Sequence, residues 1–263
     1  GIWQVAVVWG IAVTLAIFLV RELSGAHINP AITIAFTVWE KSLKFKQAIF
    51  YIFAQFVGAV LAGALVYLLF ASAIVNFETL AHIRRGLPGS ELSAMMFGEY
   101  FPNPSLSGQA KQVLANVIFW DAFLTELVGT ALLALVVFVV TKENYIPRNL
   151  QPVLIGLTVA IIISLLAPIT QAGLNPARDF GPRLVSYFAG WRQIAIPAPN
   201  YGFLVYIFGP VFGALVGGGL GKLVTSADLQ APAKSWSGNR KLSLRRKVAS
   251  RPAVASKKIL RSS

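Results

Sequence analysis

The tripeptide Asn-Pro-Ala occurs twice in this chain, as Asn29-Pro30-Ala31 and Asn175-Pro176-Ala177, and both copies lie within apolar sequence. The two asparagines are 146 residues apart. Asn is favoured at the N-cap of a helix, and Pro at the first helical position costs no hydrogen bond, because that N–H has no helical partner. One copy alone therefore predicts only that a helix begins there. Two copies at membrane depth predict paired interrupted helices around a solute path, because irregular backbone in a bilayer must line a cavity or be buried by protein.

Hydrophobic residues make up 56% of the chain and charged residues 13%, which predicts a membrane protein rather than a soluble domain. A helix needs about 20 apolar residues to cross roughly 30 Å of hydrocarbon. Five segments meet this requirement: 3–21, 47–74, 119–141, 151–170 and 203–224. The segments that begin at the two motifs, 29–39 and 175–189, are too short to cross and are predicted to be half-helices. The absence of Cys excludes a disulfide framework and a thiolate metal site, and the two His residues form no metal-binding cluster with Glu.

The two halves of the chain repeat one order of segments: a span, a motif and a span rich in small residues. In the second half an additional span, 119–141, precedes this series. By symmetry, one span is missing from the first half, and a chain that starts with Gly1 instead of Met is expected to have lost its true beginning. The prediction is an all-α inverted-repeat bundle of five full spans and two half-helices over residues 1–225, followed by a basic segment, 226–263.

Small residues in two spans predict close helix packing. The last span carries Gly209, Gly213, Gly217 and Gly221, one residue in four, which places a smooth strip on one helix face. Ala59 and Gly63 in the second span offer a matching surface. This strip is interpreted as packing inside the bundle.

Lys and Arg in the short loops predict the orientation in the membrane. If the spans alternate, the basic loops and the C-terminal segment share one side, which is then cytoplasmic, with Gly1 outside and Ser263 inside. The residues concerned are Arg21, Lys41, Lys44, Lys46, Lys142, Arg148 and Lys222. The opposite side holds residues 75–118, where Arg84 and Arg85 are offset by Glu78, Glu91 and Glu99.

The segment 226–263 contains ten Lys or Arg residues and one acidic residue, Asp228. This composition predicts a disordered cytoplasmic tail. An alternative is attraction to anionic lipid headgroups, at roughly 1 kcal/mol per basic residue near the surface. Nucleic-acid binding is disfavoured because the rest of the chain reads as a membrane protein.

The motifs and their surroundings resemble the aquaporin superfamily, and within it the glycerol-facilitator branch. The resemblance covers residues 1 to about 225 and rests on four stretches: Ser-Gly-Ala-His-Ile-Asn-Pro-Ala at 24–31, Leu-Asn-Pro-Ala-Arg-Asp-Phe-Gly-Pro-Arg at 174–183, Phe-Pro-Asn-Pro at 101–104, and Ala-Gly-Trp at 189–191. Asp179, directly after Arg178, separates glycerol channels from most water-only channels of this family. The resemblance implies six spans and two half-helices that meet mid-membrane, with a pore in each subunit of a homotetramer.

The chain departs from the family pattern in three places. The family's first span, with its buried Glu, is absent. Ala172 stands where glycerol channels commonly have an aromatic residue, and Ile163 stands where they often have Gly. Together with Trp9 and Arg178, these residues form a predicted constriction that resembles the one in plant nodulin-type channels, which also pass glycerol.

Four polar or amphipathic side chains are predicted to carry the chemistry of a pore. In aquaporin-type channels generally, an Arg and the positive ends of the half-helix dipoles exclude cations, and weak binding keeps solutes moving. The amides of Asn29 and Asn175 are predicted to donate to a central solute or water, which would interrupt proton hopping. Arg178 is predicted to donate to solute hydroxyls. Trp9, about 30 Å from Asn29 along a straight helix, is predicted to contact solute carbon at the external mouth. The alternatives are an arginine and a tryptophan that anchor to the membrane interface.

Further residues are predicted to support the pore. Pro30, Ala31, Pro176 and Ala177 start the two half-helices. Asp179 is expected to order the loop around Arg178. The resemblance implies that Glu126 accepts hydrogen bonds from half-helix backbone. His27 and Gln55 are expected to be structural, and His27 could line the cytoplasmic half through its carbonyl.

These observations predict a passive channel for glycerol, other small neutral solutes and water that excludes protons and ions, with no cofactor and no enzymatic activity. A channel mainly for water or metalloid hydroxides is the alternative in the same class. A coupled secondary transporter is the alternative from another class. Such a transporter needs a series of ionisable residues along its path, and the spans here contain only Glu126 and Arg178, which argues against it. A third alternative is that a form without the first span folds poorly and conducts nothing.

Overall fold

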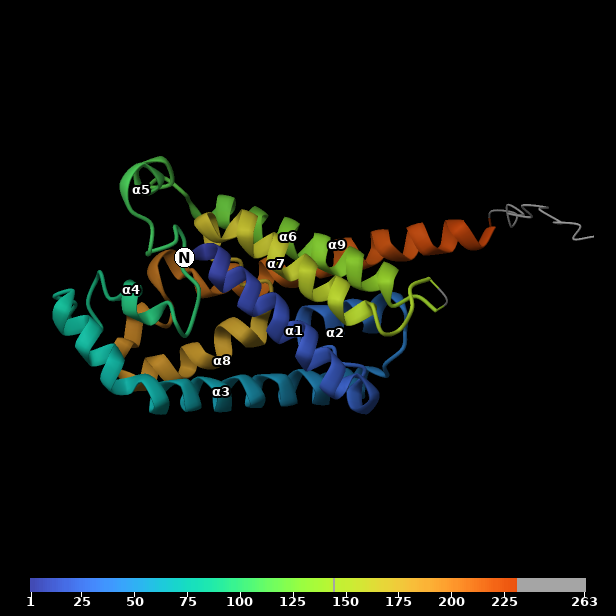
Figure 1. The fold of residues 1–263 in the computed structure, drawn as a ribbon, viewed down its shortest axis with the longest axis horizontal. Coiled ribbons are helices and arrows are strands. Elements are labelled where there is room, and N and C mark those ends of the chain that lie inside the picture. Colours follow the sequence, from blue (N-terminus) through green and yellow to red (C-terminus); the bar gives the residue numbers. More distant parts are fainter. Residues whose placement is uncertain (144, 231–263) are drawn as a thin grey trace, which may run out of the picture. The chain divides into compact units, whose positions relative to one another are not determined.

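The computed structural model describes residues 1–143 and 145–230, with side chains described up to residue 226. Within these residues, five helices are long and apolar enough to cross a membrane (Figure 1): α1 (Ile2–Ser24), α3 (Phe45–Leu80), α6 (Phe119–Val140), α7 (Gln151–Thr170) and α9 (Phe203–Gln230). The predicted spans and the all-α class are thereby confirmed. The basic segment expected from residue 226 starts inside α9, and its remaining residues, 231–263, lie outside the described part of the chain.

Two half-helices, α2 (Pro30–Trp39) and α8 (Pro176–Ser186), begin at the motifs as predicted. Asn29 and Asn175 are N-caps with extended backbone, at φ −155° and −152°, and each side-chain oxygen accepts a hydrogen bond from the first turn. α8 is shorter than the predicted 175–189, because a π-helical turn, Tyr187–Trp191, follows it. The positive φ of Gly190, 110°, breaks the helical backbone within this turn.

Helix α3 extends six residues beyond the predicted span, which stopped at residue 74 because Glu78 was counted among loop charges. In the structure Glu78 is only 7% exposed. Its carboxylate accepts hydrogen bonds from Arg85, with Nη2 at 2.7 Å, and from the Ser93 hydroxyl at 2.8 Å. A buried charge with such partners can be carried inside a helix, so the helix continues to Leu80.

Helix α9 packs closely against α6 along its glycine strip. A Cβ added to Gly213 would lie 2.3 Å from the carbonyl oxygen of Leu127 on α6. The partner predicted for this strip, the surface around Ala59 and Gly63, was wrong. That surface instead receives α8, where Gly181 approaches Ala59 and Pro182 approaches Gly63. Contact between small residues brings backbones together in both places, but the spacing of small residues does not say which pair of helices will meet.

We expect Gly217→Ala to destabilise the bundle by about 1–3 kcal/mol, the usual cost of overpacking. The new Cβ would lie 2.0 Å from the carbonyl oxygen of Ala131, so α6 and α9 must separate. Thermal unfolding in detergent measures the effect. The matched control is Gly58→Ala on α3, whose new Cβ meets no heavy atom within 4 Å apart from its chain neighbours and the backbone of its own helix, among the described residues. Equal melting temperatures for the two variants would contradict the packing argument.

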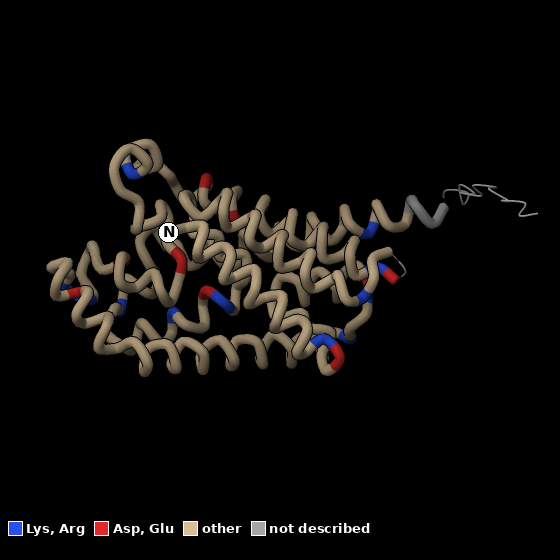
Figure 2. The backbone as a smooth tube through the Cα atoms, viewed as in Figure 1, with Lys and Arg blue, Asp and Glu red and all other residues tan. Residues whose placement is uncertain are grey.

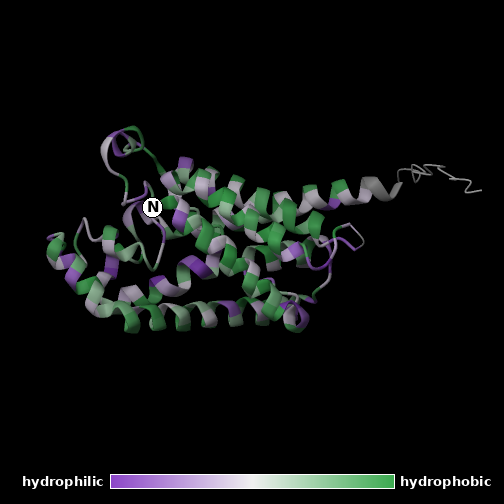
Figure 3. Cartoon of the chain, viewed as in Figure 1, coloured by the Kyte–Doolittle hydropathy of each residue, from purple (hydrophilic) through white to green (hydrophobic). Residues whose placement is uncertain are grey.

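Shorter helices shape the segments between the spans. They are α4 (Glu91–Ala94), α5 (Gly108–Val113), η2 (Arg192–Ile194) and η3 (Pro199–Tyr201). Figure 2 shows charged residues mainly near helix ends and in loops, with a small group of both signs in the interior. Figure 3 shows that the long helices are predominantly apolar. Leu19 on α1 and Leu68 on α3 are 76% and 75% exposed, as expected of surfaces that lipid or neighbouring helices cover in a bilayer.

Candidate functional site

The two half-helices meet through a reciprocal pair of hydrogen bonds at their N-termini. The Asn29 side-chain N–H donates to the carbonyl of Leu174 at 2.8 Å, and the Asn175 side-chain N–H donates to the carbonyl of Ile28, also at 2.8 Å. Each asparagine thus caps its own helix through Oδ1 and joins the other motif through Nδ2. An amide has two N–H groups, so a second donor remains on each side chain. The opposed helix N-termini also bring two positive dipole ends together.

The backbone that leads into each motif repeats with the same 146-residue offset as the motifs themselves. Left-handed φ angles occur at Gly25, Ala26 and Ile28, and again at Gln171, Ala172 and Leu174. Such a conformation costs roughly 1–3 kcal/mol for a non-glycine residue and persists only where surrounding contacts impose it. Both stretches border the same cavity. The N–H and C=O groups of this irregular backbone therefore lie where solutes or water can form hydrogen bonds with them.

Glu126 supplies the contacts that hold the second of these stretches. Its fully buried carboxylate accepts hydrogen bonds from the Thr170 hydroxyl at 2.6 Å, Gly173 N–H at 2.9 Å and Leu174 N–H at 2.7 Å. The carboxylate thus satisfies backbone donors that α7 and α8 leave unpaired. The structure places Glu126 where the resemblance implied, as an acceptor for the backbone before the half-helix.

A cavity of about 1600 Å³ is bordered by the tips of both half-helices and by residues near both ends of α1, Ile2 and Arg21. A 23-residue helix is about 34 Å long, close to the thickness of a hydrocarbon core. The predicted pore residues that line this cavity are Trp9, His27, Asn29, Ile163, Ala172, Asn175 and Arg178. The structure therefore brings together side chains from α1, α7, both half-helices and the stretches before them.

Arg178 and Trp9 form one wall of this cavity. The guanidinium carbon of Arg178 lies 4.7 Å from the centre of the Trp9 ring, within the range of a cation–π contact. Ile163 and Ala172 are each 4% exposed on the same cavity. The wall therefore combines an aromatic face and aliphatic groups with a fork of N–H donors, as an amphipathic solute requires. That these residues select the solute stays a prediction.

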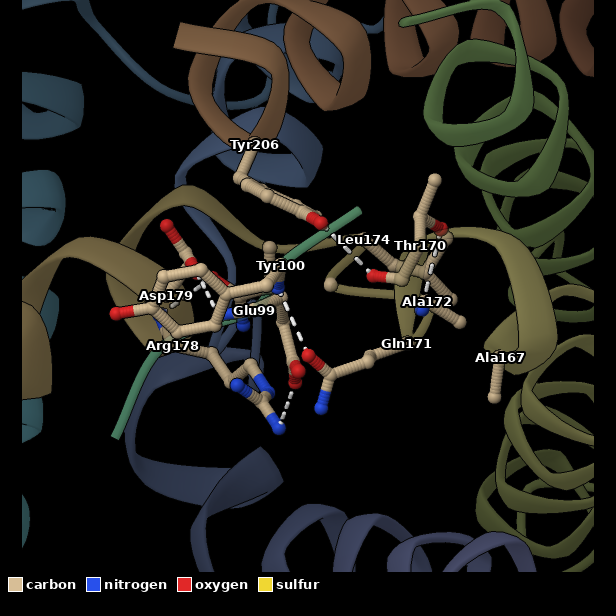
Figure 4. A network of polar contacts seen from close by, with 12 residues as sticks. Glu99, Tyr100, Ala167, Thr170, Gln171, Ala172, Leu174, Arg178, Asp179 and Tyr206 are labelled. Carbon is tan, nitrogen blue, oxygen red and sulfur yellow. Dashed lines mark hydrogen bonds and ion pairs between the residues drawn. The ribbon is translucent and has the colours of Figure 1, made fainter. Parts of the chain in front are cut away.

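Two polar residues of the cavity wall were missed by the sequence-based prediction. Glu99 is 2% exposed and its carboxylate forms an ion pair with Nη2 of Arg178. The side-chain oxygen of Gln171 accepts from the backbone N–H of Tyr100 at 2.8 Å (Figure 4). The available signal was that Glu99 lies just before residues 101–104, one of the stretches that carry the family resemblance. Its charge was interpreted instead as balancing Arg84 and Arg85.

Asp179 and Arg183 hold the loop that carries Glu99, whereas Asp179 was expected to order the loop around Arg178. One oxygen of the buried Asp179 carboxylate accepts from the Glu99 N–H at 2.7 Å, and the other accepts from Arg183 Nε at 2.7 Å. Arg183 in turn donates to the carbonyls of Glu99 and Ala195. Asp179 and Arg183 therefore hold the N–H and the carbonyl of Glu99. Arg178, one residue before Asp179, contacts the Glu99 side chain.

His27, two residues before Asn29, lies in a polar and aromatic cluster. Its Nδ1 lies 3.3 Å from the Thr33 hydroxyl, which also accepts from Gln55 Nε2 at 3.0 Å. The imidazole stacks on Phe36, with ring centroids 5.0 Å apart. These contacts fit the structural role expected of His27 and Gln55. Pro30, Ala31, Pro176 and Ala177 are all buried at the starts of the half-helices.

Comparisons with known proteins agree with this architecture. The family model described as major intrinsic protein matches residues 1–220. The glycerol uptake facilitator protein of Pseudomonas aeruginosa is 41% identical over 239 residues, 89% of this chain and 80% of that protein. A propanediol uptake facilitator of Salmonella typhimurium is 39% identical and covers 82% of this chain and 79% of its own length. The X-ray structure of the aquaglyceroporin from Plasmodium falciparum superimposes with a TM-score of 0.71 at 27% identity, over 87% of this chain and 86% of that one.

Proposed function

Because this chain belongs to the major intrinsic protein family, we propose that it is a passive membrane channel for glycerol and related small neutral solutes, with some permeability to water. Membership makes it a multi-pass membrane protein and a channel, not an enzyme. The identity to glycerol and propanediol facilitators over most of the chain supports small polyols as the solutes.

The observation that carries the proposal is the cavity bordered by both half-helix tips and by Arg178 and Trp9. A polyol must shed water to enter such a space, so the wall has to replace its lost hydrogen bonds without binding it tightly. Arg178 and the second N–H groups of Asn29 and Asn175 offer donors to hydroxyl oxygens. The Trp9 ring and Ile163 offer apolar surface to the carbon side of the solute.

Exclusion of ions and protons is part of the same proposal. The guanidinium and the positive ends of α2 and α8 repel cations along the path. A water that accepts from both asparagine amides has its lone pairs engaged, and this orientation interrupts a proton-conducting chain of hydrogen bonds. Asn29, Asn175, Arg178, Trp9, Ile163 and Ala172 are the residues proposed to act on solutes.

The assembly and orientation are proposed on the family resemblance and the charge distribution. We propose a homotetramer in the cell membrane, with a pore in each subunit and lipid around the outside. The end of the cavity near Trp9 is placed outside the cell, and the end near Arg21 and Arg148 inside, together with the basic tail beyond residue 225.

Proteoliposomes that contain the full chain test the function. After shrinking in sorbitol they are expected to reswell in glycerol at least tenfold faster than empty liposomes, measured by stopped-flow light scattering. A rate equal to that of empty liposomes would refute conduction and would favour a non-conducting form. Parallel rates for urea, water and boric acid rank the solutes, and a glycerol rate below that of boric acid would favour the metalloid alternative. Uptake that requires a proton or sodium gradient would favour a coupled transporter.

A further inference from the structure

The buried ion pair between Glu99 and Arg178 is the feature of the cavity wall that pore function does not explain by itself. Both side chains border the cavity, and the Arg178 side chain is 22% exposed whereas that of Glu99 is 2% exposed. The pair occupies Nη2, one of the donor groups that a solute hydroxyl would otherwise use. Pairing also neutralises the charge beside the Trp9 ring.

The loop around Glu99 is held independently of its carboxylate. The Glu99 N–H donates to Asp179, its carbonyl accepts from Arg183, and the next N–H, of Tyr100, donates to Gln171. These three backbone contacts fix the peptide whatever the charge of the side chain. The carboxylate is therefore available for a role other than holding the loop.

Charged and titratable groups from three helices surround Glu99. Helix α8 contributes Arg178, Asp179 and Arg183, α6 contributes Glu126, and α9 contributes Tyr206. Two cations and two other carboxylates therefore act on the Glu99 carboxylate, and Arg178 is the cation in direct contact with it. The charge of Arg178 as a solute meets it depends on whether Glu99 is ionised.

We propose that Glu99 determines specificity in this channel, because its ionisation decides whether a solute meets a neutral ion pair or an unpaired guanidinium. This proposal rests on the proposed function of the same cavity. Hydrogen bonds to charged groups are stronger than those between neutral groups. An unpaired guanidinium therefore holds a hydroxyl more tightly, and it also attracts small anions. Tight binding slows conduction, since a solute must leave the site as readily as it enters.

The titration of Glu99 falls in an accessible range. Burial raises the pKa of Glu99 to about 8, and the charge of Arg178 opposes this rise. Below that pH the carboxyl group is mostly protonated and neutral, so the positive charge of Arg178 is not balanced. Above it the carboxylate neutralises Arg178. Glycerol transit is therefore expected to accelerate as the pH rises through about 8.

The wild-type chain provides the first test, in proteoliposomes with glycerol as the probe at pH 6.5 to 9.5. We expect the maximal flux to rise about fivefold across this range, with a parallel rise in the glycerol concentration that half-saturates it. At pH 6.5 nitrate is expected to inhibit glycerol flux, and at pH 9.5 this inhibition is expected to be lost. A glycerol flux that is present but independent of pH would overturn the inference and leave the channel function intact.

Glu99→Gln provides the second test, because glutamine keeps the size of the side chain and an acceptor oxygen but cannot ionise. We expect its flux, half-saturating concentration and nitrate inhibition to match those of the wild type at pH 6.5 at every pH. The matched control is Glu91→Gln in the same loop, which is expected to keep the wild-type pH profile. A merely structural role of Glu99 would lower the flux without lowering the half-saturating concentration. That result, or a pH profile that survives in Glu99→Gln, would contradict the proposal.

Discussion

Replacing Arg178 by alanine is expected to make the channel leak protons and small cations, at a rate at least tenfold above the wild type. The substitution removes the positive charge beside Trp9 and leaves the Glu99 carboxylate without its partner on the cavity wall. Without Arg178, burial keeps the Glu99 carboxyl group protonated and neutral, so this wall no longer carries a charge that repels cations, and the lost guanidinium also widens the path. The leak is measured in proteoliposomes with an internal pH-sensitive dye after an external acid pulse.

Two further variants show whether the leak has this cause. Arg178→Ala combined with Glu99→Ala is expected to leak at least as fast as Arg178→Ala alone, because Glu99 is already neutral without Arg178. The matched control, Arg84→Ala, replaces an exposed arginine of the loop that follows α3, and its proton leak is expected to equal that of the wild type. If Arg178→Ala excluded protons as well as the wild type does, the guanidinium would not be the ion barrier, and the half-helix dipoles would have to supply it.

Glu126→Leu is expected to destabilise the protein by about 3–9 kcal/mol and to abolish glycerol conduction. Three donors, from Thr170, Gly173 and Leu174, would lose their acceptor in a site that is fully buried. Each unsatisfied buried donor costs about 1–3 kcal/mol. The left-handed backbone at Ala172 and Leu174 would also lose the contacts that impose it. Thermal unfolding in detergent and glycerol flux measure the two effects.

A graded series tests this account of Glu126. Glu126→Gln keeps one acceptor oxygen but turns an amide NH2 toward N–H donors, so an intermediate loss is expected. Asp121→Leu removes an exposed carboxylate from the same helix and loses one hydrogen bond to the N–H of Ile118, with an expected cost of about 1 kcal/mol. An equal loss for Glu126→Leu and Asp121→Leu would show that the carboxylate does not hold the backbone before α8.

The helices could be predicted because the bilayer imposes simple requirements on a sequence. Each predicted span lies within or close to a helix of the structure, and both half-helices begin at the proline after a capping asparagine. The end of α3 could not be predicted, because Glu78 is buried by Arg85, which is seven residues further along the chain and beyond the helix. The predicted partner of the α9 glycine strip was also wrong, because small residues permit close contact with any helix that presents a complementary surface.

The sequence by itself determined where the chain crosses the membrane, where the two half-helices start and which family it belongs to, because apolar length, capping residues and local motifs are properties of consecutive residues. Only the tertiary structure decided what surrounds the solute path. The bonds from Asn29 to Leu174 and from Asn175 to Ile28 join residues 145 and 147 positions apart. The pair of Glu99 with Arg178 joins a loop to a half-helix, and no local pattern encodes such a contact. A charge in a membrane is stable only beside its partner, so the fold and not the motif assigns Arg178 its electrostatic environment.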